Sequence, residues 1–261
     1  MTNQNTDKTS RQVVAILQAR MSSSRLSGKV LKPILDQPML ALQIQRVLNS
    51  KKIDKLVIAT SEHATDDAIA TLCKNLKVDC FRGSLPDVLD RFYQAATKYN
   101  AEHIVRLTGD CPLSDAEIID KVITLHLSTQ SDYTTNSILP DDPKNHITFP
   151  DGLDVEVITM QCLSKLWRDI KQESYREHVT SYVRLHPEKY TINYLHHPQD
   201  LSKHRWTVDE PQDFVLIKNI FKALYPVKPN FNCQDVVDYI ERNPTLRQIN
   251  NEFQHEKYRK Q

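Results

Sequence analysis

Glycine is scarce in this chain, with four residues in 261, and the shortage excludes two common nucleotide-binding loops. A dinucleotide-binding G-x-G-x-x-G sequence places three glycines within six positions, and a Walker A loop needs an earlier glycine and a hydroxyl after its lysine. The four glycines stand far apart, at Gly28, Gly83, Gly109 and Gly152, and Val30 follows Lys29. Any phosphate site therefore has to be built in another way.

Net charge and long apolar runs are also nearly absent. Lys and Arg total 34 against 33 for Asp and Glu, so the net charge of +1 gives no overall attraction to nucleic acid or an anionic membrane. The longest apolar runs, such as Val13–Leu17, are far shorter than the roughly 20 residues of a membrane helix. Residues 1–11 are polar and lack the apolar stretch of a signal peptide. We expect a cytoplasmic protein with no nucleic-acid or membrane partner.

Paired cysteines are missing as well. The five cysteines stand singly, with no C-x-x-C pair and no histidine at zinc-finger spacing, at Cys73, Cys80, Cys111, Cys162 and Cys233. We expect reduced, mostly buried thiols rather than disulfides or metal ligands.

The remaining composition is that of an ordinary globular domain. Hydrophobic residues make up 39% and charged residues 26%, which excludes collagen-like, low-complexity and wholly disordered chains. We predict a disordered tail over residues 1–11 and one domain over 12–245. An insertion at about 140–190, which opens with a proline-bearing loop, is predicted to form a lid or a dimer contact. Residues 246–261 are predicted to form a polar, peripheral tail.

Short β-branched runs alternate with segments of helical period from residue 12 onward. Strands are predicted over residues 12–17, 56–59, 78–81, 104–107, 153–158, 191–195 and 205–208. Helices are predicted over 39–48, 66–76, 87–99 and 213–224, after Asp115, and in the region that ends near His186. This order implies a Rossmann-like α/β fold with a mainly parallel sheet covered by helices on both faces. Ligands of such sheets bind beyond the carboxyl ends of the strands, so the loops there should carry the site.

The first predicted strand leads into a loop rich in cations and hydroxyls. Residues 18–29 include one glycine and six polar side chains of interest, Arg20, Ser22, Ser23, Ser24, Arg25 and Lys29. A polyphosphate site needs such groups, because N–H groups and hydroxyls surround the oxygens and fixed positive charge neutralises them. The alternative is a solvated basic loop without a ligand.

Two carboxylates stand at the ends of predicted strands. Asp110 follows residues 104–107, and Asp209 follows residues 205–208. A divalent ion that bridges nucleotide phosphates takes one or two carboxylates together with phosphate oxygens and water, so this pair suits Mg²⁺. The alternative for Asp110 is an ordinary Gly-Asp turn. The two aspartates stand 99 positions apart, so only the fold can bring them together.

These residues belong to an ordered series of motifs that resembles one family. Residues 18–29 are similar to the QARMGSTRLPGK signature of bacterial sugar-acid cytidylyltransferases, which activate 3-deoxy-manno-octulosonic and nonulosonic acids. The closer match is the branch named after spore coat polysaccharide biosynthesis protein F. Further matches follow at residues 59–61, 66–67, 82–84, 87–92, 106–112, 151–156, 176–180 and 205–209. Each motif alone is weak, and the ordered set, over roughly residues 12–225, is specific.

The resemblance implies a fold of the nucleotide-diphospho-sugar transferase type. It also implies a homodimer that transfers CMP from CTP to an acidic sugar and releases pyrophosphate. Arg20, Arg25 and Lys29 would be catalytic by holding the triphosphate, with Lys29 nearest the leaving pyrophosphate. Asp110 and Asp209 would carry Mg²⁺. The nucleotide-binding set would be Gln18, Ala19, Ser22, Ser23, Ser24, Thr60, Ser61, Arg82, Thr108 and Gly109. The sugar side would be Asp87, Arg91, Asp151, Asp154, Glu156 and His178.

Several of these assignments leave alternatives open. Asp151 and Asp154 either orient sugar hydroxyls, or Asp154 and Glu156 form the wet face of an alternating strand. His178 either recognises an acidic substrate, lies at a subunit contact or has a structural role. In-line attack on phosphorus needs charge stabilisation more than a covalent nucleophile, so Cys111 is expected to be a packing residue.

Two other functions remain possible from the sequence. A glycosyltransferase of the related fold usually carries an Asp-x-Asp pair, which Gly109-Asp110-Cys111 lacks. A non-catalytic nucleotide-binding protein would fit two departures from the signature, Ser22 in place of glycine and Ser27 in place of proline.

Overall fold

The computed structural model describes residues 12–137 and 148–253. The predicted disordered tail, residues 1–11, lies outside these ranges. Most of the proline-bearing loop (138–147) and the end of the predicted C-terminal tail (254–261) also lie outside them.

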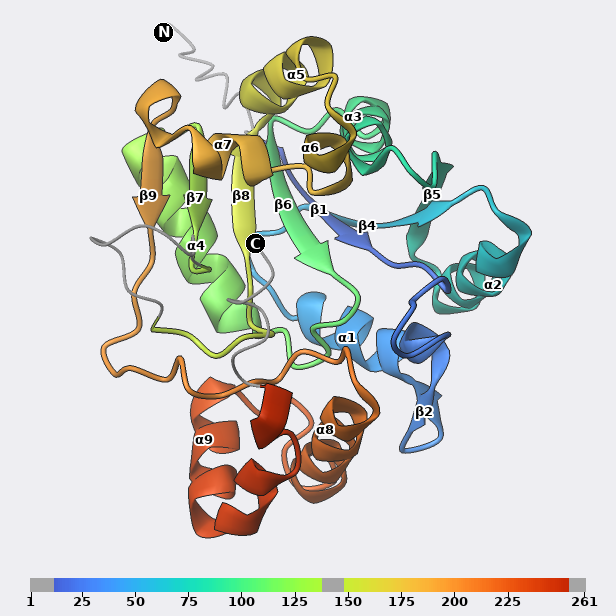
Figure 1. Ribbon diagram of the computed structural model, residues 1–261, viewed down its shortest axis with the longest axis vertical. Coiled ribbons are helices and arrows are strands. Elements are labelled where there is room, and N and C mark those ends of the chain that lie inside the picture. The colour runs from blue at the N-terminus through green and yellow to red at the C-terminus, as the bar shows by residue number, and fades with distance from the viewer. Residues whose placement is uncertain (1–11, 138–147, 254–261) are drawn as a thin grey trace, which may run out of the picture.

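A seven-stranded sheet forms the centre of the described chain, in the order β5-β4-β1-β6-β8-β7-β9 (Figure 1). The strands are β1 (Val13–Gln18), β4 (Lys55–Ser61), β5 (Asp79–Gly83), β6 (His103–Thr108), β7 (Tyr133–Thr135), β8 (Glu156–Thr159) and β9 (Ile192–Tyr194). Strands β5, β4, β1 and β6 are parallel, and β8 runs antiparallel to both of its neighbours. The predicted mainly parallel α/β sheet is confirmed.

Helices cover both faces of this sheet. They are α1 (Met39–Val47), α2 (Asp67–Leu76), α3 (Val88–Lys98), α4 (Ala116–Thr129), α5 (Met160–Asp169), α6 (Glu173–Glu177), α7 (Ser181–Leu185), α8 (Pro211–Leu224) and α9 (Cys233–Arg242). Figure 1 shows α8 and α9 side by side, at the end of the sheet toward which β6 points. A small hairpin, β2 (Pro33–Ile34) with β3 (Gln37–Pro38), precedes α1. Within the described ranges no helix is long and apolar enough to cross a membrane.

The continuous apolar run of β1 reflects burial on both faces. Val14 and Ile16 pack into a core cluster with residues of α3 and α5, whereas Ala15 and Leu17 pack into a second cluster with residues of α1, α4 and α8. Successive strand residues point to opposite faces, so a strand covered on both sides has no polar position. The five cysteines carry free thiols, as predicted.

Two strand predictions are wrong in detail. Residues 205–208 form no strand, and only an isolated bridge joins Arg205 to Asp151. Strand β8 starts at Glu156 rather than at residue 153, and Glu156 is buried instead of lying on a wet face. An alternation of acidic and apolar residues indicates a solvent-exposed strand face only when no cation is buried opposite the acidic side chain. Here the neighbouring strand β6 places Arg106 opposite Glu156.

Sequence reasoning also missed β7 and α9. Strand β7 has only three residues, too few for a recognisable period. Helix α9 does carry signals, because Asn232 and Asp235 form a capping box and Val236 and Ile240 lie on one face. The segment after α9 is polar but not peripheral, since Asn250 is buried and the nearby apolar side chains pack on the core.

The buried imidazole of His126 makes stability depend on pH. His126 on α4 lies against His103 and Thr134, with ring-nitrogen contacts of 3.0 and 3.1 Å. Burial, with a smaller effect of His103, lowers the pKa of His126 from 6.5 to about 4. As pH falls from 6.5 toward 4, the unfolded chain takes up this proton first, so stability is lost in that window. The pKa difference corresponds to about 3 kcal/mol.

We therefore expect H126Q to flatten the slope of unfolding free energy between pH 6.5 and pH 4, measured by urea denaturation. His204, whose pKa burial also lowers to about 4, leaves a residual slope. The matched control is H196Q, because His196 is exposed. Equal slopes for H126Q and the native chain would show that His126 carries no such linkage.

Candidate active site

The loops after β1 and β6 start side by side at the carboxyl edge of the sheet. Gln18 and Thr108, the last residues of the two strands, are paired in register, and the Gly109 N–H donates to the Gln18 carbonyl at 2.8 Å. The cation-rich loop and the Gly-Asp turn therefore border the same space, as the parallel topology predicts.

The loop after β1 is anchored at Met21. The Met21 N–H donates to Asp66 Oδ1 at 2.8 Å, and its carbonyl accepts from the N–H groups of Ser23 and Gly28 at 2.9 and 3.0 Å. Gly28 has φ of 66°, a left-handed conformation that glycine adopts without strain. Burial opposes ionisation of Asp66, but hydrogen bonds from Ser61 and Met21 outweigh it and lower the pKa. Asp66 thus ties this loop to the end of β4, a role that sequence reasoning did not assign.

The backbone at position 22 does not require the glycine that the family signature has there. Its φ is not positive, in contrast to Gly28 in the same loop. A side chain is therefore tolerated at this position, and the hydroxyl lines a pocket.

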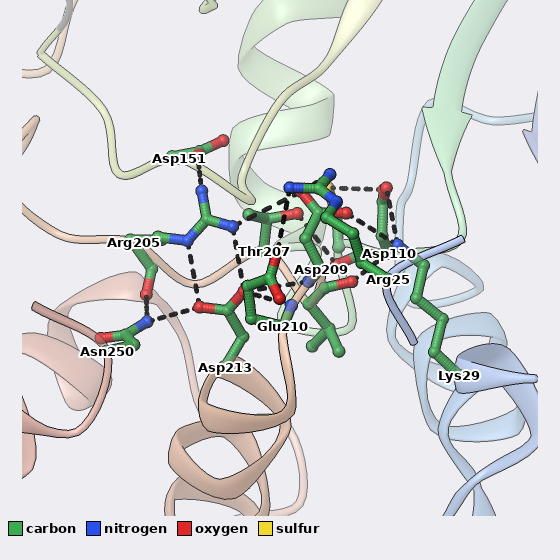
Figure 2. A network of polar contacts seen from close by, with 12 residues as sticks. Arg25, Lys29, Asp110, Asp151, Arg205, Thr207, Asp209, Glu210, Asp213 and Asn250 are labelled. Carbon is green, nitrogen blue, oxygen red and sulfur yellow. Dashed lines mark hydrogen bonds and ion pairs between the residues drawn. The ribbon is translucent and has the colours of Figure 1, made fainter. Parts of the chain in front are cut away.

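The fold brings Asp110 and Asp209 to one cation, the ammonium group of Lys29 (Figure 2). Lys29 Nζ lies 2.8 Å from Asp209 Oδ1, 3.4 Å from Asp110 Oδ2 and 2.7 Å from the Val208 carbonyl. Burial opposes the charge of both Lys29 and Asp110. Their mutual attraction, with hydrogen bonds, outweighs it, so the Lys29 pKa is raised and the Asp110 pKa is lowered. Both groups are therefore charged at neutral pH.

Arg25 contacts the outer oxygen of Asp209 and the neighbouring carboxylate of Glu210. Its guanidinium lies 3.0 Å from Asp209 Oδ2 and 3.3 Å from Glu210 Oε1. The network in Figure 2 sets three cations, Arg25, Lys29 and Arg205, against five carboxylates, Asp110, Asp151, Asp209, Glu210 and Asp213. The cluster thus has an excess of two negative charges.

The donor set suits a divalent ion that arrives with phosphate. Carboxylate oxygens of Asp110 and Asp209 face one point, and oxygen ligands are those that Mg²⁺ prefers. Within the described chain there is no group of three or more His, Cys, Asp or Glu side chains that could hold a metal ion. Two carboxylates completed by phosphate oxygens and water match the way in which Mg²⁺ commonly binds nucleotides.

Two adjoining pockets open at this edge. The loop pocket, of about 350 Å³, is lined by Gln18, Ala19, Arg20, Ser22, Ser23, Ser24, Arg25, Lys29, Val30, Val88, Arg91, Arg106, Thr108, Gly109, Asp110, Glu177, His178 and Asp209. The second pocket, of about 740 Å³, is lined by Gln18, Ser24, Arg25, Arg106, Thr108, Asp110, Cys111, Ser137, Asp151, Asp154, Glu156, His178, Arg184, Arg205, Thr207 and Asp209. The shared residues include Arg25 and the two carboxylates at Lys29, so that cluster lies where the pockets meet.

A buried ion pair forms part of the wall of the second pocket. Arg106 Nη1 donates to Glu156 Oε2 at 2.6 Å, and the Thr180 hydroxyl donates to the same oxygen at 2.9 Å. Burial opposes ionisation of Glu156, but Arg106 and Arg184 outweigh it and lower its pKa. Val179, beside Thr180, has φ of 52°, which is rare for a β-branched residue.

His178 precedes that turn and lines both pockets. Burial lowers its pKa, and the nearby charges of Arg106, Arg184 and Arg20 lower it further, against an opposing effect of Glu177. The imidazole of His178 is therefore neutral at pH 7, chiefly because it is buried.

Four predicted site residues do not line either pocket. Thr60 is fully buried, and Ser61 bonds to Asp66. Arg82 donates to the carbonyls of Ser61 and His63, and Asp87 caps α3 and pairs with Arg176 at 2.7 Å. Their contacts are structural, and their ligand-binding roles stay predictions.

The other predicted residues do line a pocket, Arg91 and Asp154 among them. Cys111 is buried, and burial raises the pKa of its thiol, which suits packing rather than nucleophilic attack. Sequence reasoning missed Arg106, Glu177, Arg184, Arg205 and Thr207. A cation inside the apolar strand 104–107 was the one signal that could have revealed Arg106.

A loop of cations and hydroxyls above paired carboxylates, at the carboxyl edge of a parallel sheet, defines a protein of the nucleotidyltransferase class. The family model described as Cytidylyltransferase matches residues 14–251, and the chain belongs to this family. The chain is 34% identical to spore coat polysaccharide biosynthesis protein SpsF of Bacillus subtilis, over 89% of this chain and 95% of that protein. It is 32% identical to a 3-deoxy-manno-octulosonate cytidylyltransferase of Zea mays, over 49% of this chain and 44% of that protein. The structure of a cytidylyltransferase from Leptospira borgpetersenii is 34% identical, with a TM-score of 0.84, and the match covers 91% of this chain and 97% of that one.

Proposed function

We propose that this cytidylyltransferase moves CMP from CTP to an acidic sugar of the nonulosonate or octulosonate type and releases pyrophosphate, with Mg²⁺ as cofactor. The observation that carries the proposal is the cluster of Lys29, Asp110 and Asp209 at the point where the two pockets meet. A reacting phosphorus at this point would have a nucleotide on one side and an acceptor on the other.

The loop pocket fits the triphosphate. Three consecutive serines and the side chains of Arg20 and Arg25 line it, and the arginines are exposed enough to reach a ligand. The acceptor hydroxyl attacks the α-phosphorus, and the bond from that phosphorus to the bridging oxygen of the leaving pyrophosphate breaks. Charge then builds on the departing oxygens, which fixed cations stabilise. Lys29, which lies between the two carboxylates and lines the loop pocket, would serve that role.

Asp110 and Asp209 would hold Mg²⁺, which when bound neutralises phosphate charge and fixes the orientation of the phosphate chain. In the free protein Lys29 provides the positive charge between these carboxylates.

The second pocket fits an acidic acceptor. Arg106 and Arg184 line it, and guanidinium groups bind carboxylates with paired hydrogen bonds. Asp151 and Asp154 also line this pocket and would supply acceptors for sugar hydroxyls. An anion with many hydroxyls matches this combination. A homodimer and a cytoplasmic location remain predictions from the sequence and the family resemblance.

The test is release of pyrophosphate from CTP in the presence of Mg²⁺ and a panel of nonulosonic and octulosonic acids. We expect release that depends on one or a few acids of the panel, with a CMP-sugar formed in equal amount. Neutral sugars of the same size serve as controls. If the protein binds CTP but releases no pyrophosphate with any member of the panel, the acidic-sugar assignment fails. Sugar transfer from a preformed nucleotide sugar without use of CTP would instead favour a glycosyltransferase.

A further inference from the structure

One buried arginine, Arg205, contacts carboxylates from three places in the chain (Figure 2). Its Nε and Nη2 donate to the two oxygens of Asp213, at 3.0 and 2.9 Å. Nη1 donates to Asp151 Oδ2 at 3.2 Å, and Nη2 also lies 3.4 Å from Asp209 Oδ2. Arg205 is only 5% exposed, so these contacts are shielded from solvent. A planar guanidinium with five donors can hold all three carboxylates at once. A lysine ammonium lacks this planar arrangement of donors and cannot make the same set of contacts.

The same group of residues fixes the backbone that carries Asp209. Asp213 Oδ2 accepts from the N–H groups of Asp209 and Glu210, at 3.0 and 2.9 Å, at the start of α8. Asn250, from the segment after α9, donates to Asp213 Oδ1 at 2.8 Å and to the Arg205 carbonyl at 3.0 Å. Both the main chain and the side chain of Asp209 are thus held by contacts that involve Asp213 or Arg205.

The two carboxylate oxygens of Asp209 contact different cations. Oδ1 faces Lys29, the cation shared with Asp110, and Oδ2 faces Arg25 and Arg205. Arg205 therefore holds the outer oxygen while the inner oxygen points at the place between the two carboxylates. Side chains that bond the free side of a metal-binding carboxylate set its orientation.

Arg205 also reaches the wall of the second pocket. The Asp151 carbonyl accepts from the N–H groups of Trp206 and Thr207, and the Asp151 N–H donates to the His204 carbonyl at 3.0 Å. The segment that carries Asp209 and the wall that carries Asp151 are therefore joined along the main chain, and Arg205 joins them again through the side chains.

We propose that Arg205 is a positioning residue that orients Asp209 for metal–nucleotide binding and Asp151 for acceptor binding, so that one side chain sets the geometry of both pockets. This inference rests on the proposed function, and it assigns no contact with the reacting atoms to Arg205.

The test compares R205K with R46K in the full-length protein. Arg46 is an equally buried arginine, 5% exposed, that donates to main-chain carbonyls away from the two pockets. Mn²⁺ binding in the presence of CTP is followed by electron paramagnetic resonance, and thermal unfolding is recorded for each variant. We expect both variants to lose stability, but only R205K to bind Mn²⁺ with CTP about 10- to 100-fold more weakly. Equal Mn²⁺ affinity in R205K and R46K would overturn the inference.

The acceptor side is tested with D151N, a change at a partly exposed carboxylate. The Michaelis constant for the acceptor acid is measured for D151N, R205K and the double variant. We expect each single change to raise this Michaelis constant. The double change should raise it by less than the product of the two single effects, because D151N and R205K remove the same contact. Independent effects of the two changes would contradict the link between Arg205 and Asp151. Failure of the native chain to bind Mn²⁺ with CTP would instead refute the proposed function itself.

Discussion

Replacing Asp209 with asparagine is expected to lower the rate of pyrophosphate release by on the order of 10²- to 10³-fold, the scale of losing one preorganised charge at a reacting centre. The change keeps the shape of the side chain but removes the charge that Lys29, Arg25 and Arg205 share. Three cations are then left with less counter-charge at the point where the phosphate chain would bind. Steady-state pyrophosphate release at saturating CTP and Mg²⁺ measures the effect.

The matched control is E241Q, which removes an exposed carboxylate on α9, away from both pockets. Thermal unfolding of both variants separates a loss of fold from a loss of chemistry. A D209N variant that keeps more than about half of the native rate would contradict the assignment of Asp209 to the reacting centre.

Substitution of Gly152 by alanine is expected to cost at least about 3 kcal/mol of unfolding free energy, because it combines backbone strain with a steric clash. Gly152 has φ of 104°, which L side chains rarely adopt, and a Cβ there would lie 2.3 Å from the Thr207 nitrogen and 2.5 Å from the Trp206 carbonyl carbon. Neither neighbour can move freely, because the N–H groups of Trp206 and Thr207 both donate to the Asp151 carbonyl. Urea denaturation measures the loss.

Gly83 provides the control for this prediction. A Cβ at Gly83 would lie 3.1 and 3.2 Å from side-chain atoms of Phe81 and Arg91, which can shift, and its φ is not positive. We expect G83A to cost less than about 1 kcal/mol. If the two variants lose similar amounts, the close approach of residues 151–152 to residues 206–207 does not limit stability. We also expect G152A to raise the Michaelis constant for the acceptor, since the strained segment carries Asp151.

The sequence predicts the parallel core of the fold well and its antiparallel edge poorly. β1 is clear because burial on both faces leaves an uninterrupted apolar run, and β6 is recognisable because Arg106 alone interrupts the apolar residues 104–107. The three residues of β7 give no period. Residues 205–208 have strand-like composition, but only one bridge forms there. The N–H groups of Trp206 and Thr207 donate to one carbonyl, that of Asp151, and the Val208 N–H donates to the Asp110 carbonyl instead of to a neighbouring strand. Local pattern cannot reveal which distant acceptor a segment will meet.

The candidate site could likewise be predicted only in part. Arg25, Lys29 and Asp110 could be found because they follow strands whose carboxyl ends must lie together. Arg205 stood in a matched motif, yet its importance depends on Asp151, 54 residues earlier, and on Asn250, 45 residues later. Glu156 looked like a solvated residue until the structure placed Arg106 against it. Partners that determine such roles come from tertiary contacts, which one sequence does not show.

The anchor of the loop after β1 has a consequence for the entropy of ligand binding. Met21 is fixed from both sides, through its N–H to Asp66 and through its carbonyl to Ser23 and Gly28. Ordering a free residue costs about 1–2 kcal/mol, so a loop of this length without an anchor would oppose binding by many kcal/mol. Because the ends are already closed at Met21, little of this loop would be left for a bound triphosphate to order. More of the attraction between the phosphates and the arginines then remains as affinity.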